Sequence, residues 1–146
     1  MIIDSHQHFW NYDPIKDAWI DDSMEAIRRD FLPKDLKPLL EKNGVDGCIA
    51  VQADQSEEET DFLLNCAEKN KFIKGVVGWL DLTSENLEKR LDYYVKNPFL
   101  KGLRHIVQAE KDDYLLRRDV QKGISKLAKY NLTYDILVYP SQLTAT

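Results

Sequence analysis

Short apolar segments alternate with amphipathic segments along almost the whole sequence. The candidate strands are residues 2–5, 47–52, 73–80, 102–106 and 133–139. Residues 48–51 and 136–138 are almost continuously apolar, which is typical of strands that are covered on both faces. The segments between the strands carry apolar residues at helical spacing. This alternation predicts parallel strands joined by right-handed crossovers, either in an open doubly wound sheet or in part of a closed barrel.

Residues that favour helix ends bound these amphipathic segments. Pro33 and Gly44 bound the first, and its start lies later if Pro38 belongs to the first turn. Ser56 followed by Glu59 matches a capping box for the second helix. The N-cap residues expected for the last two helices are Ser84 and Asp119.

Composition and charge narrow the possible partners. A chain of 146 residues that is 43% hydrophobic is long enough for one domain, residues 1–146, with a substantial core. Acidic and basic residues are mixed, the net charge is −5, and no basic stripe is present, which argues against nucleic acid. The apolar runs are too short for a bilayer, and the N-terminus lacks the pattern of a secretion signal. Cys48 and Cys66 match no metal or redox motif, so we expect reduced thiols. Together with the short apolar runs, this predicts a cytoplasmic protein without a membrane partner.

His6 and His8 are two of the three histidines, and they lie at the end of the first candidate strand. Because side chains alternate along a strand, residues two apart point the same way and converge on one point. Two imidazoles in this arrangement suit a divalent metal. The alternative is that both histidines form hydrogen bonds to the nearby backbone.

Other polar residues follow the candidate strands, where parallel α/β proteins gather their chemistry. An arginine such as Arg104 presents a planar fork that suits a carboxylate or a lactone oxygen, unless it forms a buried salt bridge with Asp81 or Asp135. His105 is its neighbour and faces the other way in a regular strand. The polar residues at the strand ends are Gln52, Asp54, Trp79, Asp81, Arg104, His105, Asp135 and Tyr139.

The segment of residues 11–30 has no clean period and carries Tyr12, Pro14 and Trp19 among many charges. A long insert after the first strand often forms a lid or wall over the site of such a fold. The alternative is a surface loop whose tryptophan packs on the domain.

Five segments of the chain together resemble the amidohydrolase-related, metal-dependent hydrolases of the sugar-lactonase type. They are residues 3–10 (IDSHQHFW), 44–53 (GVDGCIAVQA), 76–82 (VVGWLDL), 101–108 (KGLRHIVQ) and 132–143 (LTYDILVYPSQL). The resemblance implies part of a (β/α)8 TIM barrel, with about five parallel strands and flanking helices. It also implies that water opens a lactone such as fuconolactone or rhamnonolactone. Some members use a divalent metal, with zinc expected here, and others carry the histidine pair yet work without metal.

By position, the resemblance implies that His6 and His8 bind the metal and that Arg104 binds the lactone substrate. The other pocket residues that it implies are Trp10, Gln52, His105 and Tyr139. A complete barrel takes about 250 residues, and the resemblance places a strand-six histidine and a general-base aspartate from strand eight beyond residue 146. We therefore expect little lactonase activity from this chain alone. The open sheet edges predict self-association or a homo-oligomer.

Two other functions stay open at this point. One is a decarboxylase or another hydrolase of the same superfamily. The other is a non-catalytic remnant that associates with itself or with a partner.

Overall fold

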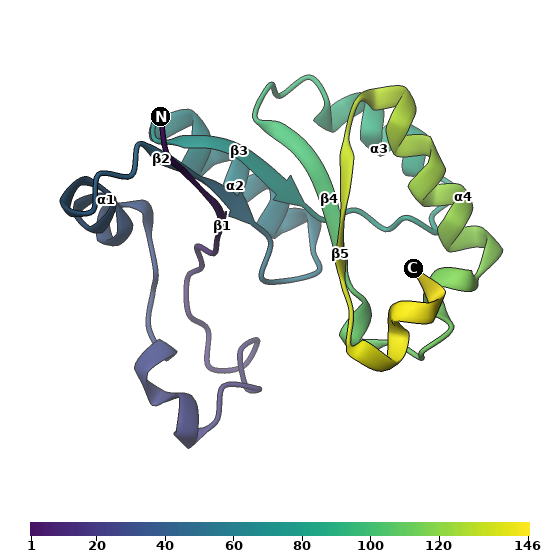
Figure 1. Ribbon diagram of the computed structural model, residues 1–146, viewed down its shortest axis with the longest axis horizontal. Coiled ribbons are helices and arrows are strands. Elements are labelled where there is room, and N and C mark those ends of the chain that lie inside the picture. The colour runs from purple at the N-terminus through teal and green to yellow at the C-terminus, as the bar shows by residue number, and fades with distance from the viewer.

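The computed structural model describes residues 1–146 and contains one sheet in which every pair of neighbouring strands is parallel (Figure 1). The strands are β1 (Ile3–Gln7), β2 (Gly47–Val51), β3 (Ile73–Gly78), β4 (Leu100–Ile106) and β5 (Thr133–Leu137). They follow the order β1-β2-β3-β4-β5, so each crossover joins adjacent strands. A doubly wound sheet reverses its strand order at a switch point, whereas a barrel does not. The expected partial (β/α)8 barrel is therefore confirmed.

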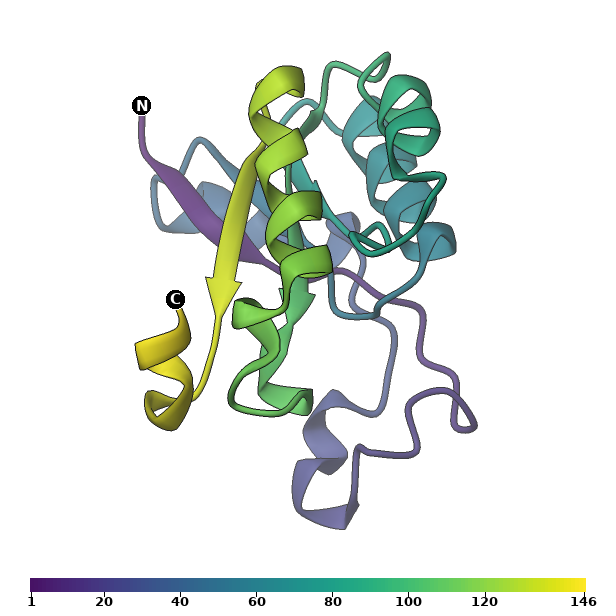
Figure 2. The same cartoon turned by 90° about the vertical axis from the view of Figure 1, so that its right-hand side faces the viewer.

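Four α-helices accompany the strands, and α2, α3 and α4 stand on one face of the sheet (Figure 2). The helices are α1 (Pro33–Lys42), α2 (Glu57–Lys69), α3 (Leu87–Tyr94) and α4 (Arg118–Lys126). Short 3₁₀ helices are η1 (Asp22–Ile27), η2 (Val107–Ala109), η3 (Tyr114–Leu116), η4 (Leu127–Tyr130) and η5 (Pro140–Ala145). None of the helices combines the length and the apolar character that crossing a membrane requires.

The main hydrophobic core lies between the sheet and its helices. Ile73 and Leu103 from the strands are buried together with Leu63 from α2 and Leu91 from α3. Because burying one such side chain contributes about 1.5–3 kcal/mol, this layer holds the helices against the strands. Gly123 allows α4 to approach closely, since a Cβ atom there would lie 2.0 Å from the carbonyl oxygen of Leu82.

The first two helices begin largely as the sequence predicts. Helix α1 starts at Pro33 and includes Pro38 in its interior, so the later start is wrong. Gly44 follows its end with a φ of +67°, a conformation that glycine adopts without steric cost. Ser56 caps α2, because its hydroxyl accepts a hydrogen bond from the N–H of Glu59 at 3.2 Å.

The expected caps of the last two helices are wrong. The N-cap of α3 is Asn86, and Ser84 accepts a hydrogen bond from the Asn86 N–H at 3.1 Å instead. Helix α4 begins one residue before Asp119, so this carboxylate lies in the first turn and pairs with Arg117 at 2.5 Å. An acidic side chain is favourable in the first turn as well as at the cap, so the sequence alone does not separate the two positions.

Candidate active site

The carboxyl ends of β1, β2 and β4 bring together His6, His8, Gln52 and Arg104. Parallel strands end at the same edge of a sheet, so residues far apart in the sequence meet there. The segment of residues 11–30 and the segments after β4 and β5 extend beyond this edge (Figure 1). We call the four side chains the strand-end cluster.

The two histidine rings converge, as their spacing on a strand predicts. The Nε2 atoms of His6 and His8 are 3.1 Å apart, and Nδ1 of His8 lies 2.9 Å from the carbonyl oxygen of Val51. A carbonyl oxygen accepts hydrogen bonds and does not donate them, so Nδ1 of His8 carries the proton and its Nε2 has a free lone pair. Burial lowers the pKa of His8, and Arg104 adds to this effect, while the hydrogen bond to Val51 opposes it. The hydrogen bond to Val51 therefore fixes the ring orientation of His8, and burial favours its neutral form.

Arg104 lies buried on β4, with only 5% of its surface exposed. Its Nη1 atom is 3.1 Å from Nε2 of His6, and its Nη2 donates to the carbonyl oxygen of Gln52. Burial lowers the pKa of Arg104, while the carboxylates of Asp135 and Glu59 oppose this change. The guanidinium still carries its charge, because arginine is not deprotonated in proteins.

Gln52 and Arg104 are joined by two hydrogen bonds, one from the Arg104 guanidinium to the Gln52 backbone and one from the Gln52 side chain to the Arg104 backbone. The side-chain Nε2 of Gln52 donates to the carbonyl oxygen of Arg104 at 3.1 Å. The two residues belong to the ends of β2 and β4, so this reciprocal pair bridges over the end of β3. The Gln52 side chain is completely buried and helps to position Arg104. Its expected role in substrate binding stays a prediction.

Arg104 forms no ion pair with Asp81 or Asp135, so the alternative of a buried salt bridge is wrong. Its Nε atom is buried without a hydrogen-bond partner, as are Oε1 of Gln52 and Nε1 of Trp10. Most buried polar atoms in proteins are paired, because an unpaired one costs about 1–3 kcal/mol. Three unpaired atoms therefore belong to residues that the sequence assigned to the site.

His105 faces away from Arg104 and makes a separate set of contacts. Nε1 of Trp79 donates to its Nδ1 at 3.2 Å, and its Nε2 lies 3.0 Å from Oε1 of Glu110. The His105 ring also stacks on Tyr114, with the ring centroids 4.8 Å apart. Both ring nitrogens have partners within the protein, and alternation along β4 explains why His105 faces away from Arg104. The expected role of His105 in substrate binding stays a prediction.

Tyr139 lies beyond β5 and is 54% exposed. Its backbone N–H donates to Oε1 of Gln142 at 2.8 Å, and its hydroxyl group forms no hydrogen bond with the strand-end cluster. The expected role of Tyr139 in substrate binding therefore stays a prediction.

The insert of residues 11–30 is closed at its base by an antiparallel bridge between Trp10 and Phe31. Trp19 is 62% exposed, so the interpretation in which this tryptophan packs on the domain is wrong. Nζ of Lys16 lies 2.8 Å from Oδ2 of Asp54, which follows β2. This contact ties the insert to the edge that carries the strand-end cluster and favours its interpretation as a wall.

The sequence did not predict that Lys16 and the buried Glu59 lie at this edge. Glu59 accepts hydrogen bonds from the N–H groups of Ala53 at 2.5 Å and Asp54 at 3.0 Å. The capping-box spacing pointed to Glu59, but it predicted a bond back to Ser56 instead. No local signal connects Lys16 with Asp54, because an ion pair across the fold leaves no periodic pattern in the sequence.

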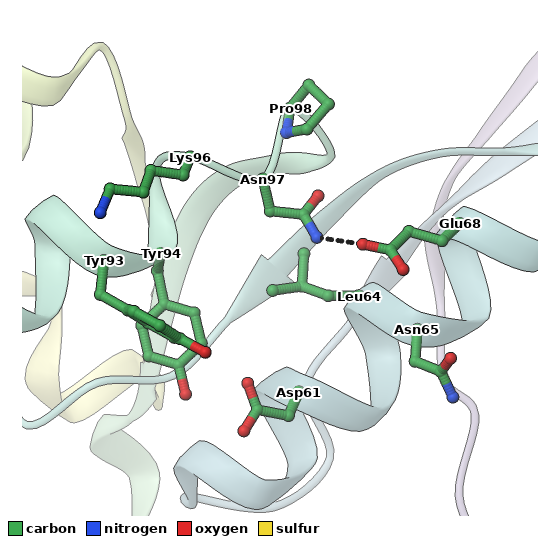
Figure 3. A pocket seen from close by; sticks show the side chains of 9 residues that line it. All are labelled: Asp61, Leu64, Asn65, Glu68, Tyr93, Tyr94, Lys96, Asn97 and Pro98. Atoms are coloured by element: carbon green, nitrogen blue, oxygen red, sulfur yellow. Dashed lines mark hydrogen bonds between the residues drawn. The ribbon is translucent and has the colours of Figure 1, made fainter.

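A surface pocket of about 420 Å³ lies elsewhere, between α2, α3 and the turn into β4 (Figure 3). Asp61, Glu68, Tyr93 and Tyr94 are among its lining residues, and Nδ2 of Asn97 donates to Glu68 at 2.7 Å. The pocket shares no residue with the strand-end cluster, so we do not assign the active site to it.

The histidine pair fits part of a metal site. Zinc–nitrogen bonds of about 2.0–2.1 Å at a tetrahedral angle place two ligand nitrogens about 3.3 Å apart. The observed separation of 3.1 Å between the two Nε2 atoms is close to this value. The chain has no group of three or more His, Cys, Asp or Glu side chains that could hold a metal ion. The chain thus offers two nitrogens that suit a divalent cation and no complete set of ligands.

Sequential parallel strands with a polar cluster at their carboxyl ends define a protein of the (β/α)-barrel class. The model of the amidohydrolase family matches residues 3–145, and the chain belongs to this family. The family membership inferred from the sequence is therefore confirmed.

Two curated relatives narrow the comparison. The chain is 35% identical over 144 residues to the L-fucono-1,5-lactonase of Burkholderia ambifaria, covering 98% of this chain and 50% of the relative. It is 38% identical over 143 residues to the L-fucono-1,5-lactonase of Burkholderia multivorans, covering 97% of this chain and 48% of the relative. The chain therefore spans about half the length of these relatives.

Solved structures agree with the fold. A crystal structure of an amidohydrolase from Burkholderia multivorans with bound zinc has a TM-score of 0.94 at 37% identity, covering 99% of this chain and 51% of that chain. A probable 2-pyrone-4,6-dicarboxylic acid hydrolase from Acinetobacter baumannii has a TM-score of 0.67 at 14% identity, covering 91% of this chain and 48% of that chain. The second similarity concerns the fold alone.

Proposed function

We propose that this chain forms the carbonyl-binding part of a hydrolase that opens a sugar lactone, of the fuconolactone or rhamnonolactone kind, to its hydroxy acid. The observation that carries the proposal is the convergence of His6, His8 and Arg104 at one edge of the sheet. The names of the two lactonase relatives support the substrate class.

In this proposal Arg104 binds the lactone carbonyl oxygen. When water adds to the carbonyl carbon, negative charge develops on that oxygen, and a fixed guanidinium stabilises it. Burial of Arg104 strengthens the interaction, because the local dielectric is lower than that of water. The ring C–O bond then breaks, and the leaving oxygen takes up a proton to complete the hydroxy acid.

His6 and His8 would hold a divalent cation through their Nε2 atoms, and we propose zinc because of the family resemblance. A bound cation supplies Lewis-acid polarisation of a carbonyl oxygen or of water. The protein's own contribution is orientation, since Val51 fixes the tautomer of His8 and Gln52 anchors Arg104.

The family resemblance assigns the water-activating carboxylate to a later strand, so we propose that this chain alone turns over little lactone. General-base catalysis commonly contributes about 10²–10⁴-fold to the rate. Binding is therefore a more direct test of the strand-end cluster than turnover.

The experiment measures binding of an aldonate, the stable product, to the 146-residue chain by calorimetry, with lactone hydrolysis followed in parallel. We expect Arg104→Gln to weaken aldonate binding at least tenfold and Arg104→Lys to weaken it less, because lysine retains the charge without the fork. The matched control is Arg118→Gln on the exposed start of α4. Equal aldonate binding by wild type and Arg104→Gln would contradict the assignment of Arg104 to the substrate site. Rapid turnover by the isolated chain would contradict the proposal that a later strand supplies the water-activating carboxylate.

A further inference from the structure

The hydrogen bonds around the histidine pair leave an unusual arrangement of lone pairs. His8 donates from Nδ1 to Val51, so its Nε2 has a lone pair directed toward His6. Arg104 has only donors, so its Nη1 donates to Nε2 of His6, which must accept. Both Nε2 atoms are therefore acceptors, although they are 3.1 Å apart.

A divalent cation would bind at the same two nitrogens. Metal ligation requires the Nε2 lone pair of His6, and Arg104 already uses that lone pair. The guanidinium is also a fixed positive charge in a buried position, where repulsion between cations is weakly screened. The metal and the guanidinium therefore exclude each other from His6.

We propose that Arg104 competes with a divalent cation for His6, so that this arginine lowers the metal affinity of the strand-end cluster. The inference rests on the proposed assignment of His6 and His8 as metal ligands. It adds a role for Arg104 as a regulator of metal binding, distinct from its contact with substrate.

Asp135 offers the displaced guanidinium a second partner. It is paired in register with Arg104 on the neighbouring strand, so both side chains project from the same face of the sheet. Asp135 is half-buried, and its carboxylate forms neither an ion pair nor a hydrogen bond. With a cation at His6, Arg104 would have this carboxylate as its alternative partner.

The test measures the affinity of zinc chloride for the full 146-residue chain by calorimetry and of cobalt(II) by its visible absorption spectrum. We expect Arg104→Met to bind both metals at least tenfold more tightly than wild type. Arg104→Lys should fall between them, because its charge remains while the fork anchored at Gln52 is lost. Unchanged or weaker binding by a folded Arg104→Met variant would overturn the proposal.

Further variants separate this proposal from the assignment of the ligands. His6→Gln and His8→Gln should weaken metal binding in both the wild-type and the Arg104→Met backgrounds; if they do not, the ligand assignment itself fails. Asp135→Asn should weaken metal binding in the wild type and have no effect in the Arg104→Met background. An equal loss in both backgrounds would show that Asp135 is a ligand and would overturn its role as the second partner of Arg104. Circular dichroism checks that each variant is folded.

Discussion

At the scale of single residues, side-chain alternation explains most of what the sequence predicted about the site. His6 and His8 converge because they are two apart, and His105 turns away from Arg104 because the two are adjacent. The pocket role of His105 came from the resemblance and stays a prediction. The burial of Gln52 was not predictable, because it depends on a hydrogen bond between strands that are separated by a third.

Glu59 illustrates the energetic cost of burying a charge at this edge. Burial raises the pKa of its carboxyl group, while hydrogen bonds from Ala53 and Asp54 and the charge of Lys16 oppose the increase. Since its folded pKa lies above the ordinary value, the folded protein binds this proton more tightly than the unfolded chain. The contribution of Glu59 to stability is therefore present at low pH and is lost as the pH rises through the folded pKa.

We predict that Glu59→Gln increases the free energy of unfolding relative to wild type at pH 7, and that the difference shrinks toward pH 4. Glutamine retains an oxygen that accepts the two backbone hydrogen bonds without carrying the buried charge. Urea unfolding at both pH values checks this, with Glu58→Gln as the control on the exposed side of the same turn. A difference that grows as the pH falls would contradict the prediction.

At the scale of elements, the helices and strands followed from periodicity, whereas the insert of residues 11–30 did not. This segment has little core of its own, since Ile20 is its only buried residue. Its ends are joined by the bridge between Trp10 and Phe31, and Lys16 joins it to Asp54. A sequence without a period gives no information about such contacts, because they depend on the finished fold.

We predict that Lys16→Gln makes the insert more susceptible to chymotrypsin, with cleavage after Tyr12 or Trp19 increasing several-fold. An exposed ion pair contributes only about 0–1 kcal/mol, so global stability should change little while local opening becomes more frequent. Mass spectrometry of timed digests locates the cuts, and Lys34→Gln, an exposed lysine on α1 without an ion pair, is the control. Identical digestion of both variants would show that the Lys16 contact does not restrain the insert.

At the scale of the whole molecule, alternation of strand and helix predicted the partial barrel, and the strand order distinguished it from an open doubly wound sheet. Strands β1 and β5 each have a neighbour on one side only. Unpaired strand edges pair readily with other chains. Ile136 on β5 is 58% exposed, which adds an apolar surface to one of these edges.

We predict that the 146-residue chain self-associates in solution and that Ile136→Lys shifts it toward the monomer. A lysine on an edge strand opposes pairing through charge repulsion and desolvation. Sedimentation velocity over a concentration series measures the effect, and Leu39→Lys, at a 57% exposed position on α1, is the matched control. A wild-type chain that is monomeric at every concentration would refute the prediction.

The reciprocal bonds between Gln52 and Arg104 have a mechanical consequence. The guanidinium donates to the main-chain carbonyl oxygen of Gln52, and the Gln52 side chain donates to the main-chain carbonyl oxygen of Arg104, so the two bonds join β2 and β4 across the end of β3. Its location therefore follows the curl of the sheet. A change in the curl of the sheet would alter the separation of β2 and β4 and would therefore shift Arg104 relative to His6.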